Sequence, residues 1–202
     1  YELAYTNVIN MLDLAGIPLL SRDRGKEHPF IMAGGPCVFN PEPMAEFFDF
    51  MVIGDGEEVL PEICKVHRQW KKSGGDKNEF LLTLSSLQGI YVPSFYQPVY
   101  RTDRTMERIE KIEDKAPKKV TKSIVSNLTE APFSTEPIVP FIEVVHDRSV
   151  VELFRGCSRG CRFCQAGMIY RPVRERSKDC ILELAKKQLE STGHDELSLL
   201  SL

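Results

Sequence analysis

The chain has 202 residues, of which 42 % are hydrophobic and 27 % are charged, as in an ordinary water-soluble globular protein. This length is enough for one large domain or two small ones. The net charge of −3 gives no overall attraction to nucleic acid or to a membrane surface. No apolar run approaches the ~20 residues that span a bilayer, so a membrane protein is excluded.

The ends of the chain and its cysteines indicate the context of the protein. No signal-peptide pattern is present at the start. Six cysteines, three of them clustered, do not form a disulfide framework for a chain of this length, so we expect a reducing cytoplasm. The chain begins with Tyr1 and ends on the apolar run LSLLSL. We therefore also expect a fragment of a longer protein.

The first 76 residues predict an α/β domain, incomplete at its N-terminus. Thr6 or Asn7 can cap a first helix that Gly16 ends. The expected strands are 17–20, 30–33 and 50–53, and the expected helices are 7–15, 43–48 and 57–72. This alternation implies parallel strands joined by crossover helices, which is part of a doubly wound α/β sheet.

Residues 77–148 predict a β-hairpin followed by an extended linker. β-Branched and aromatic residues become frequent over 81–112, where we expect extended strands and a hairpin that turns near residues 102–104. Four prolines and little periodicity over 115–140 predict an extended connector.

Residues 149–202 predict one strand–loop–helix–strand unit, incomplete at its C-terminus. The strands are expected at 149–154 and 197–202. Ser177 can cap the helix between them, which Gly193 ends. In (β/α) barrels the catalytic loops follow the C-terminal ends of strands, and a cysteine-rich loop stands at that position here.

That loop carries Cys157, Cys161 and Cys164 at the spacing C-x3-C-x2-C. A structural zinc site or a ferredoxin-type cluster would need four protein ligands. Buried structural thiols would need apolar neighbours, and arginines surround these three. A [4Fe–4S] cluster with one open iron fits best, because thiolates are soft ligands suited to iron–sulfur centres.

The arginines of the loop have more than one interpretation. They can favour thiolates and an anionic cluster, meet a carboxylate or phosphate, or form a solvated basic rim. These residues are Arg155, Arg159, Arg162, Arg171, Arg174 and Arg176.

The segment RGCSRGCRFC resembles the cysteine motif of the radical S-adenosylmethionine (SAM) superfamily. The resemblance covers residues 149–202 and implies the start of a radical SAM (β/α) partial barrel. It makes Cys157, Cys161 and Cys164 the cluster ligands and places Phe163 near the SAM adenine, largely through its backbone. In that family SAM is cleaved reductively to a 5′-deoxyadenosyl radical. Further SAM contacts lie on later strands, so we expect these 202 residues to be inactive by themselves.

The segments IMAGGP and VIGDGEE resemble the last strands and turns of a Rossmann-like cobalamin-binding domain. This weaker resemblance covers about residues 1–70 and implies that Gly34, Gly35, Gly54 and Gly56 border a corrinoid. The alternative is that these glycines form tight turns with no ligand.

Together the two resemblances imply a radical SAM Fe–S oxidoreductase or transferase with an unknown substrate. We expect an electron donor such as flavodoxin or ferredoxin. Nucleic acid is allowed by the basic loop and disfavoured by the acidic remainder. The alternative function is a non-catalytic module that binds a corrinoid or a protein partner and uses the cysteine loop as a structural metal clip.

Overall fold

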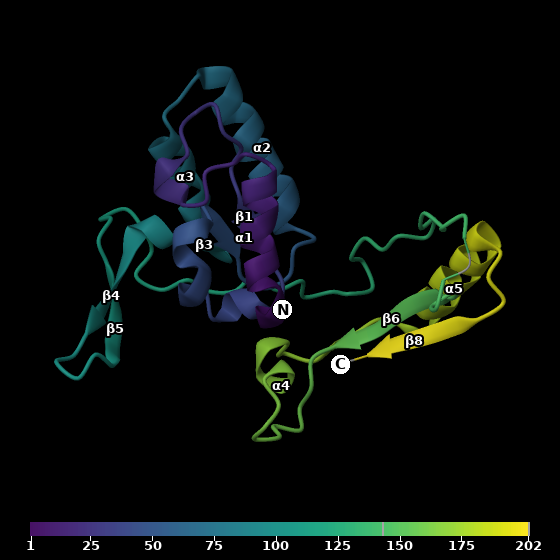
Figure 1. Cartoon of the computed structure of the whole chain (residues 1–202). Coiled ribbons are helices and arrows are strands. Elements are labelled where there is room, and N and C mark those ends of the chain that lie inside the picture. Colours follow the sequence, from purple (N-terminus) through teal and green to yellow (C-terminus); the bar gives the residue numbers. More distant parts are fainter. Residues whose placement is uncertain (143, 202) are drawn as a thin grey trace. The chain divides into compact units, whose positions relative to one another are not determined.

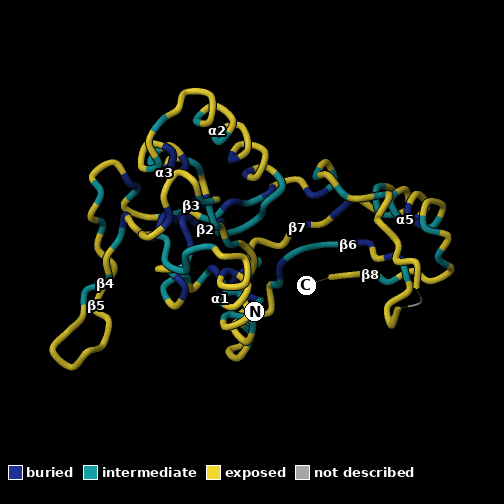
Figure 2. Tube along the Cα trace, turned by 45° about the horizontal axis from the view of Figure 1, so that its top comes forward, coloured by how far each residue is buried: buried dark blue, intermediate teal, exposed yellow. Residues whose placement is uncertain are grey.

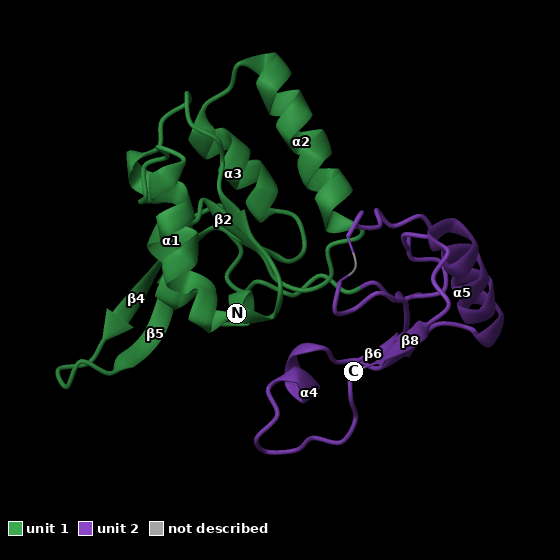
Figure 3. Ribbon diagram, turned by 45° about the vertical axis from the view of Figure 1, so that its right-hand side comes forward, with its two compact units in different colours: residues 1–124 green, residues 125–202 purple. Residues whose placement is uncertain are grey.

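The computed structural model describes residues 1–142 and 144–201. The chain divides into two compact units, Tyr1–Ile124 and Val125–Leu202 (Figure 3). Each unit mixes helices with a small sheet, so the protein is of the α/β class, as predicted. None of the helices in the described part of the chain is long and apolar enough to span a bilayer.

Unit 1, residues 1–124, is built on a three-stranded sheet of order β1-β2-β3 (Figure 1). Its strands are β1 (Met32–Ala33), β2 (Phe50–Val52) and β3 (Ile90–Tyr91). The first two pair in parallel, whereas β3 runs antiparallel to β2. Two helices, α2 (Val59–Ser73) and α3 (Lys77–Ser85), lie between β2 and β3 in the chain. The expected doubly wound order is therefore not continued by the third strand.

Helices cover both faces of this sheet, because successive side chains of β2 point to opposite faces. On one face Phe50 and Val52 pack against α2 (Val59–Ser73) and α3 (Lys77–Ser85). On the other face Met51 belongs to a second apolar cluster with α1 (Tyr5–Leu14). The apolar stripe that predicts α2 is confirmed, and the helix ends at Gly74 in a left-handed conformation.

No helix is predicted from the sequence at α3, Lys77–Ser85. Residues 77–85 were expected to begin an extended region, but Asp76 and Glu79 form a capping box that starts a helix there. The helix buries Phe80, Leu81 and Leu84 in the core.

Several other local predictions for unit 1 are wrong or inexact. No side chain caps α1, so Thr6 and Asn7 do not have the expected role, although Gly16 follows the helix with φ +66°. Residues 17–20 are not a strand. The helix expected at 43–48 is a 3₁₀ helix, Glu42–Phe47. The strand expected at 30–33 is limited to the two residues of β1, and neither is fully buried.

The predicted hairpin is present as β4 (Tyr96–Tyr100) and β5 (Met106–Lys111). Its turn lies at the expected place, with Arg104 at φ +67°. The whole tip, residues 101–110, is exposed (Figure 2). At its base the Tyr96 ring stacks on Tyr91 of β3, with centroids 4.9 Å apart. That contact joins the hairpin to the core.

Unit 2 contains a βαβ arrangement, as predicted. Strand β6 (Ser149–Arg155) pairs in parallel with β8 (Leu197–Ser201), and α5 (Lys178–Thr192) connects them. Two smaller elements, α4 (Ala166–Ile169) and β7 (Arg174–Glu175), lie between β6 and α5 in the chain, and β7 pairs antiparallel with β6. The last residue of the strand expected at 197–202 lies outside the described residues.

The ends of α5 follow the sequence signals. The Ser177 hydroxyl accepts a hydrogen bond from the backbone N–H of Cys180, as the expected N-cap. Gly193 ends the helix in a left-handed conformation. Polar side chains of α5 also hold the preceding connector: Gln188 and Ser191 donate hydrogen bonds to the carbonyls of Ser134 and Thr135. The part of the connector around Ser134 and Thr135, which belongs to unit 2, is therefore fixed to α5.

Candidate metal centre

The cysteine loop begins where β6 ends and runs to α4 (Figure 1). Its first residue, Gly156, is buried and has φ +92°. A Cβ atom at this position would lie 2.6 Å from the carbonyl oxygen of Tyr170 and 2.7 Å from that of Pro172. Only glycine can therefore make this turn without displacing the backbone that leaves the loop. Gly160 also has a positive φ, of +69°.

All three cysteines of the loop are free thiols. Cys161 is exposed, and Cys157 and Cys164 are partly exposed. The backbone N–H of Cys164 donates to the carbonyl of Cys161 at 3.1 Å, and the N–H of Arg159 lies 3.5 Å from the Cys157 sulfur. Among residues 1–142 and 144–201, no group of three or more Cys, His, Asp or Glu side chains is gathered as a metal site.

The donor set nevertheless fits an iron–sulfur centre chemically. It consists of three soft sulfur ligands, accessible and not committed to disulfides, on one glycine-containing loop. The expected convergence of the thiols on one point is not present in this conformation. Binding a cluster would therefore require the loop to close around it.

Phe163 lies in this loop with its side chain 92 % exposed. Its side chain has no apolar packing that would fix it. Its expected place near an adenine ring stays a prediction.

The structure separates the six arginines by burial: Arg155 is half-buried, and the other five are either exposed or buried. Arg159, Arg162 and Arg171 are exposed on the loop, and the Arg171 side chain reaches the Cys157 carbonyl at 3.4 Å. Arg174 and Arg176 of β7 and its exit are buried, with exposed fractions of 8 % and 5 %. A solvated basic rim therefore describes only part of the set.

Arg174 holds the exit of the loop. Its guanidinium donates to the carbonyls of Tyr170 at 3.2 Å, Pro172 at 3.1 Å and Val125 at 3.1 Å. One side chain thus ties the segment after the cysteines to the start of the connector.

Glu152 of β6 is the centre of an ion-pair network below the loop. Its carboxylate accepts from Arg155 at 2.6 and 3.1 Å and lies 3.3 Å from Arg176. Arg176 also donates to the Leu128 carbonyl and lies over the Phe133 ring, 5.1 Å from its centroid. The sequence does not predict that Glu152 joins Arg155 and Arg176. The signal for it is a glutamate in the middle of the strand SVVELFR.

The four candidate corrinoid glycines lie at the C-terminal ends of β1 and β2. Gly35 has φ +95° and no atom within 4 Å of an added Cβ, so this turn is open. A Cβ on Gly54 would collide with the backbone of Ser123. A Cβ on Gly56 would lie 3.2 Å from the Leu60 side chain of α2. The close approach of the Ser123 backbone therefore explains why glycine stands at position 54, without a bound ligand.

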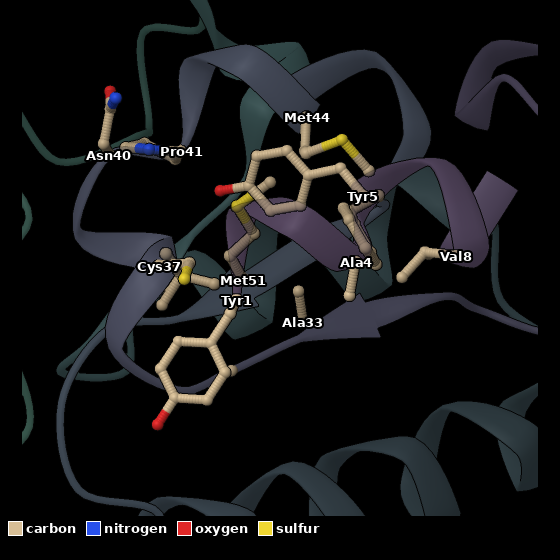
Figure 4. Close-up of a pocket in the computed structure, with 13 residues that line it drawn as sticks. Tyr1, Ala4, Tyr5, Val8, Ala33, Cys37, Asn40, Pro41, Met44 and Met51 are labelled. Carbon is tan, nitrogen blue, oxygen red and sulfur yellow. The ribbon is translucent and has the colours of Figure 1, made fainter.

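A cavity of about 130 Å³ lies beside Gly34 (Figure 4). Its apolar lining includes Tyr5, Met44 and Met51, and the Cys37 thiol faces the same region. This volume is well below the ~300–1,000 Å³ of small-molecule sites. In this conformation the cavity does not fit a large macrocycle.

A known family and a known protein are similar to the chain. Residues 1–93 match the family model described as radical SAM proteins, N-terminal. The whole chain is 28 % identical over 207 aligned residues to the uncharacterized protein MJ0966 of Methanocaldococcus jannaschii. The chain spans 36 % of the length of that relative. Residues 1–93 are therefore similar to the N-terminal region of radical SAM proteins.

Proposed function

We propose that the full-length protein is a radical SAM enzyme whose cluster is held by Cys157, Cys161 and Cys164. The observation that carries the proposal is the position of three free, accessible thiols at the C-terminal end of β6, within a βαβ unit. The match of the preceding residues to the N-terminal region of radical SAM proteins supports it independently.

When bound, a [4Fe–4S] cluster supplies the electron for reductive cleavage of SAM to a 5′-deoxyadenosyl radical. The chain's own residues supply position and charge. The three cysteines act as thiolate ligands, and Gly156 and Gly160 allow the backbone to turn around a compact group. Exposed Arg159 and Arg162 place positive charge beside an anionic centre, where it is favourable.

Glu152 and Arg176 act as positioning residues in this proposal. Arg176 connects β6, through Glu152, with the connector at Leu128 and Ala131. These bonds fix the strand from which the cysteine loop starts. A fixed strand lowers the cost of ordering the loop around its cluster, because fewer residues must be immobilised on binding.

The reaction also requires an external one-electron donor and a substrate. We propose a flavodoxin- or ferredoxin-like donor, which would approach the accessible cysteine loop. Cobalamin is not part of the proposal, because one candidate turn contacts Ser123 and the cavity beside the other is small. The corrinoid- or partner-binding module remains the alternative function.

Anaerobic reconstitution of the full-length protein with iron and sulfide tests the proposal. We expect about four irons per chain for a [4Fe–4S] centre and an electron paramagnetic resonance signal after reduction. Alanine at any of the three loop cysteines should abolish the signal. Cys180→Ala is the matched control, because Cys180 lies on α5 with its thiol bonded to the Thr129 carbonyl.

Two results would overturn the proposal. One is a single zinc per chain that persists in air and needs the same cysteines. The other is retention of the full iron content by the Cys157→Ala, Cys161→Ala and Cys164→Ala variants. Production of 5′-deoxyadenosine from SAM under reducing conditions is the corresponding activity measurement.

A further inference from the structure

Unit 1 contains a groove of about 980 Å³ that the proposed function does not use. Phe30, which precedes β1, and Phe50, which begins β2, line it together with the C-terminal half of α2. It therefore lies at the N-terminal edge of the two parallel strands, whereas the glycine turns lie at their C-terminal edge. Its volume is within the range of small-molecule sites, ~300–1,000 Å³.

One wall of the groove is aromatic. Trp70 of α2 packs against Phe30 and Phe80, with ring centroids 5.2 and 5.3 Å apart. Phe80 is buried, but Phe30 and Trp70 are only partly covered. The indole N–H of Trp70 donates to the Asp76 carbonyl at 2.9 Å, which fixes the ring. A fixed, partly exposed aromatic surface is suited to stacking with a planar ring.

The rim of the groove is cationic. Lys26, Arg68 and Lys71 line it and are exposed, and none of their side chains has an ion-pair or hydrogen-bond partner within the described residues. The single acid of the lining, Glu27, already lies 3.1 Å from a ring nitrogen of His28. In a chain with a net charge of −3, three unpaired cations at one groove favour an anionic ligand.

We propose that this groove binds a nucleoside phosphate, with the base stacked on Trp70 beside Phe30, whose ring plane is 70° from that of Trp70, and the phosphate held by Arg68 and Lys71. Arginine and lysine are the usual partners of phosphate oxygens. A simple anion would not use the aromatic wall, and an apolar ligand would not use the cations. SAM fits less well because its sulfonium is positive and it lacks a phosphate. A free nucleotide and the end of a single-stranded RNA present the same chemistry.

Trp70 is the only tryptophan of the chain, so its fluorescence reports on this groove directly. The experiment titrates the protein with AMP, adenosine, inorganic phosphate and a short oligoadenylate. We expect saturable quenching by AMP, weaker quenching by adenosine and none by phosphate alone. Tighter binding of the oligoadenylate than of AMP identifies RNA as the source, and equal or weaker binding identifies a free nucleotide.

Charge reversal separates this site from non-specific attraction. Arg68→Glu and Lys71→Glu should each weaken AMP binding by about tenfold or more, because each removes a charge-assisted contact. Lys72→Glu is the matched control: it carries the same change on an exposed residue of α2 that does not line the groove. Absence of quenching at millimolar AMP, or equal weakening by all three variants, would overturn the proposal. The cluster is not involved in these measurements, so their outcome is independent of the proposed function.

Discussion

Asp49 is expected to be the most sensitive charged position of unit 1. Its carboxylate accepts from Arg24 Nε at 3.1 Å and from the backbone N–H of Ile31 at 2.8 Å. Lys77 Nζ lies 2.7 Å from the other oxygen, off the hydrogen-bonding direction, and completes an ion triad. The side chains of Asp49 and Arg24 are each only 1 % exposed. Water cannot replace either partner at this depth.

Asp49→Ala therefore leaves a buried guanidinium without its counter-charge. Breaking one side of a buried pair typically costs about 3–5 kcal/mol. Arg24 keeps bonds to the carbonyls of Pro18, Leu19 and Phe47, which soften the loss, so we expect the lower part of this range. Asp49→Asn should cost less than alanine, since its amide oxygen can still accept from Ile31.

Urea unfolding followed by Trp70 fluorescence measures this loss in unit 1. With a slope of about 2 kcal/mol per molar urea, a loss of about 3 kcal/mol lowers the midpoint by about 1.5 M. Glu46→Ala is the control, because its ion pair with Arg22 is 3.7 Å long and both side chains are 70 % exposed. Such a surface pair contributes at most about 1 kcal/mol. Equal midpoint shifts for the two variants would refute the reasoning.

Two further predictions concern one position in each unit. Gly156→Ala should destabilise unit 2 by about 1–3 kcal/mol in a thermal unfolding assay, because the new methyl group meets two carbonyl oxygens at a positive φ. Gly193→Ala is the control, and it should cost less because its new methyl group, at a φ of +73°, lies in open space. Burial, followed by a 2.5 Å hydrogen bond to Glu42, raises the pKa of Tyr91. The protonated side chain therefore contributes its full stabilisation of the folded state below pH ~10, and this contribution is lost as the pH rises above that value. Tyr91→Phe should flatten this alkaline decline, and an unchanged pH profile would contradict the assignment.

The sequence predicts best where one local signal decides the outcome. The apolar stripe of α2, the Ser177 cap of α5 and the turn of the hairpin each depend on residues close together in the chain, and all three are confirmed. The helix α3 also had a local signal, Asp76 followed by Glu79, but the glycines before it suggested a break. A glycine turn and a helix cap can stand side by side, and here the capping box starts a new helix directly after the turn.

Long-range partners could not be predicted in this way. Asp49 stands between two phenylalanines, which indicates an unusual buried charge, but its partners Arg24 and Lys77 are 25 and 28 positions away. The same holds for Glu152 and Arg176, which meet only because β7 returns beside β6. For the three loop cysteines the spacing supplied the candidate ligands, and their convergence on one metal centre stays a prediction.

At the glycine turns the sequence indicates that a neighbouring group lies close to the backbone, but it does not identify that group. A glycine after a strand indicates that something approaches the backbone closely, and a bound corrinoid was one expectation. At Gly54 the approaching group is the connector: Asp55 N–H donates to the Ser123 carbonyl, and Ser123 N–H donates to the Ile53 carbonyl, both at 2.9 Å. A ligand at this turn would have to displace those bonds. Any corrinoid would therefore have to bind at the open turn of Gly34 and Gly35, or detach the segment that leads toward the cysteine unit.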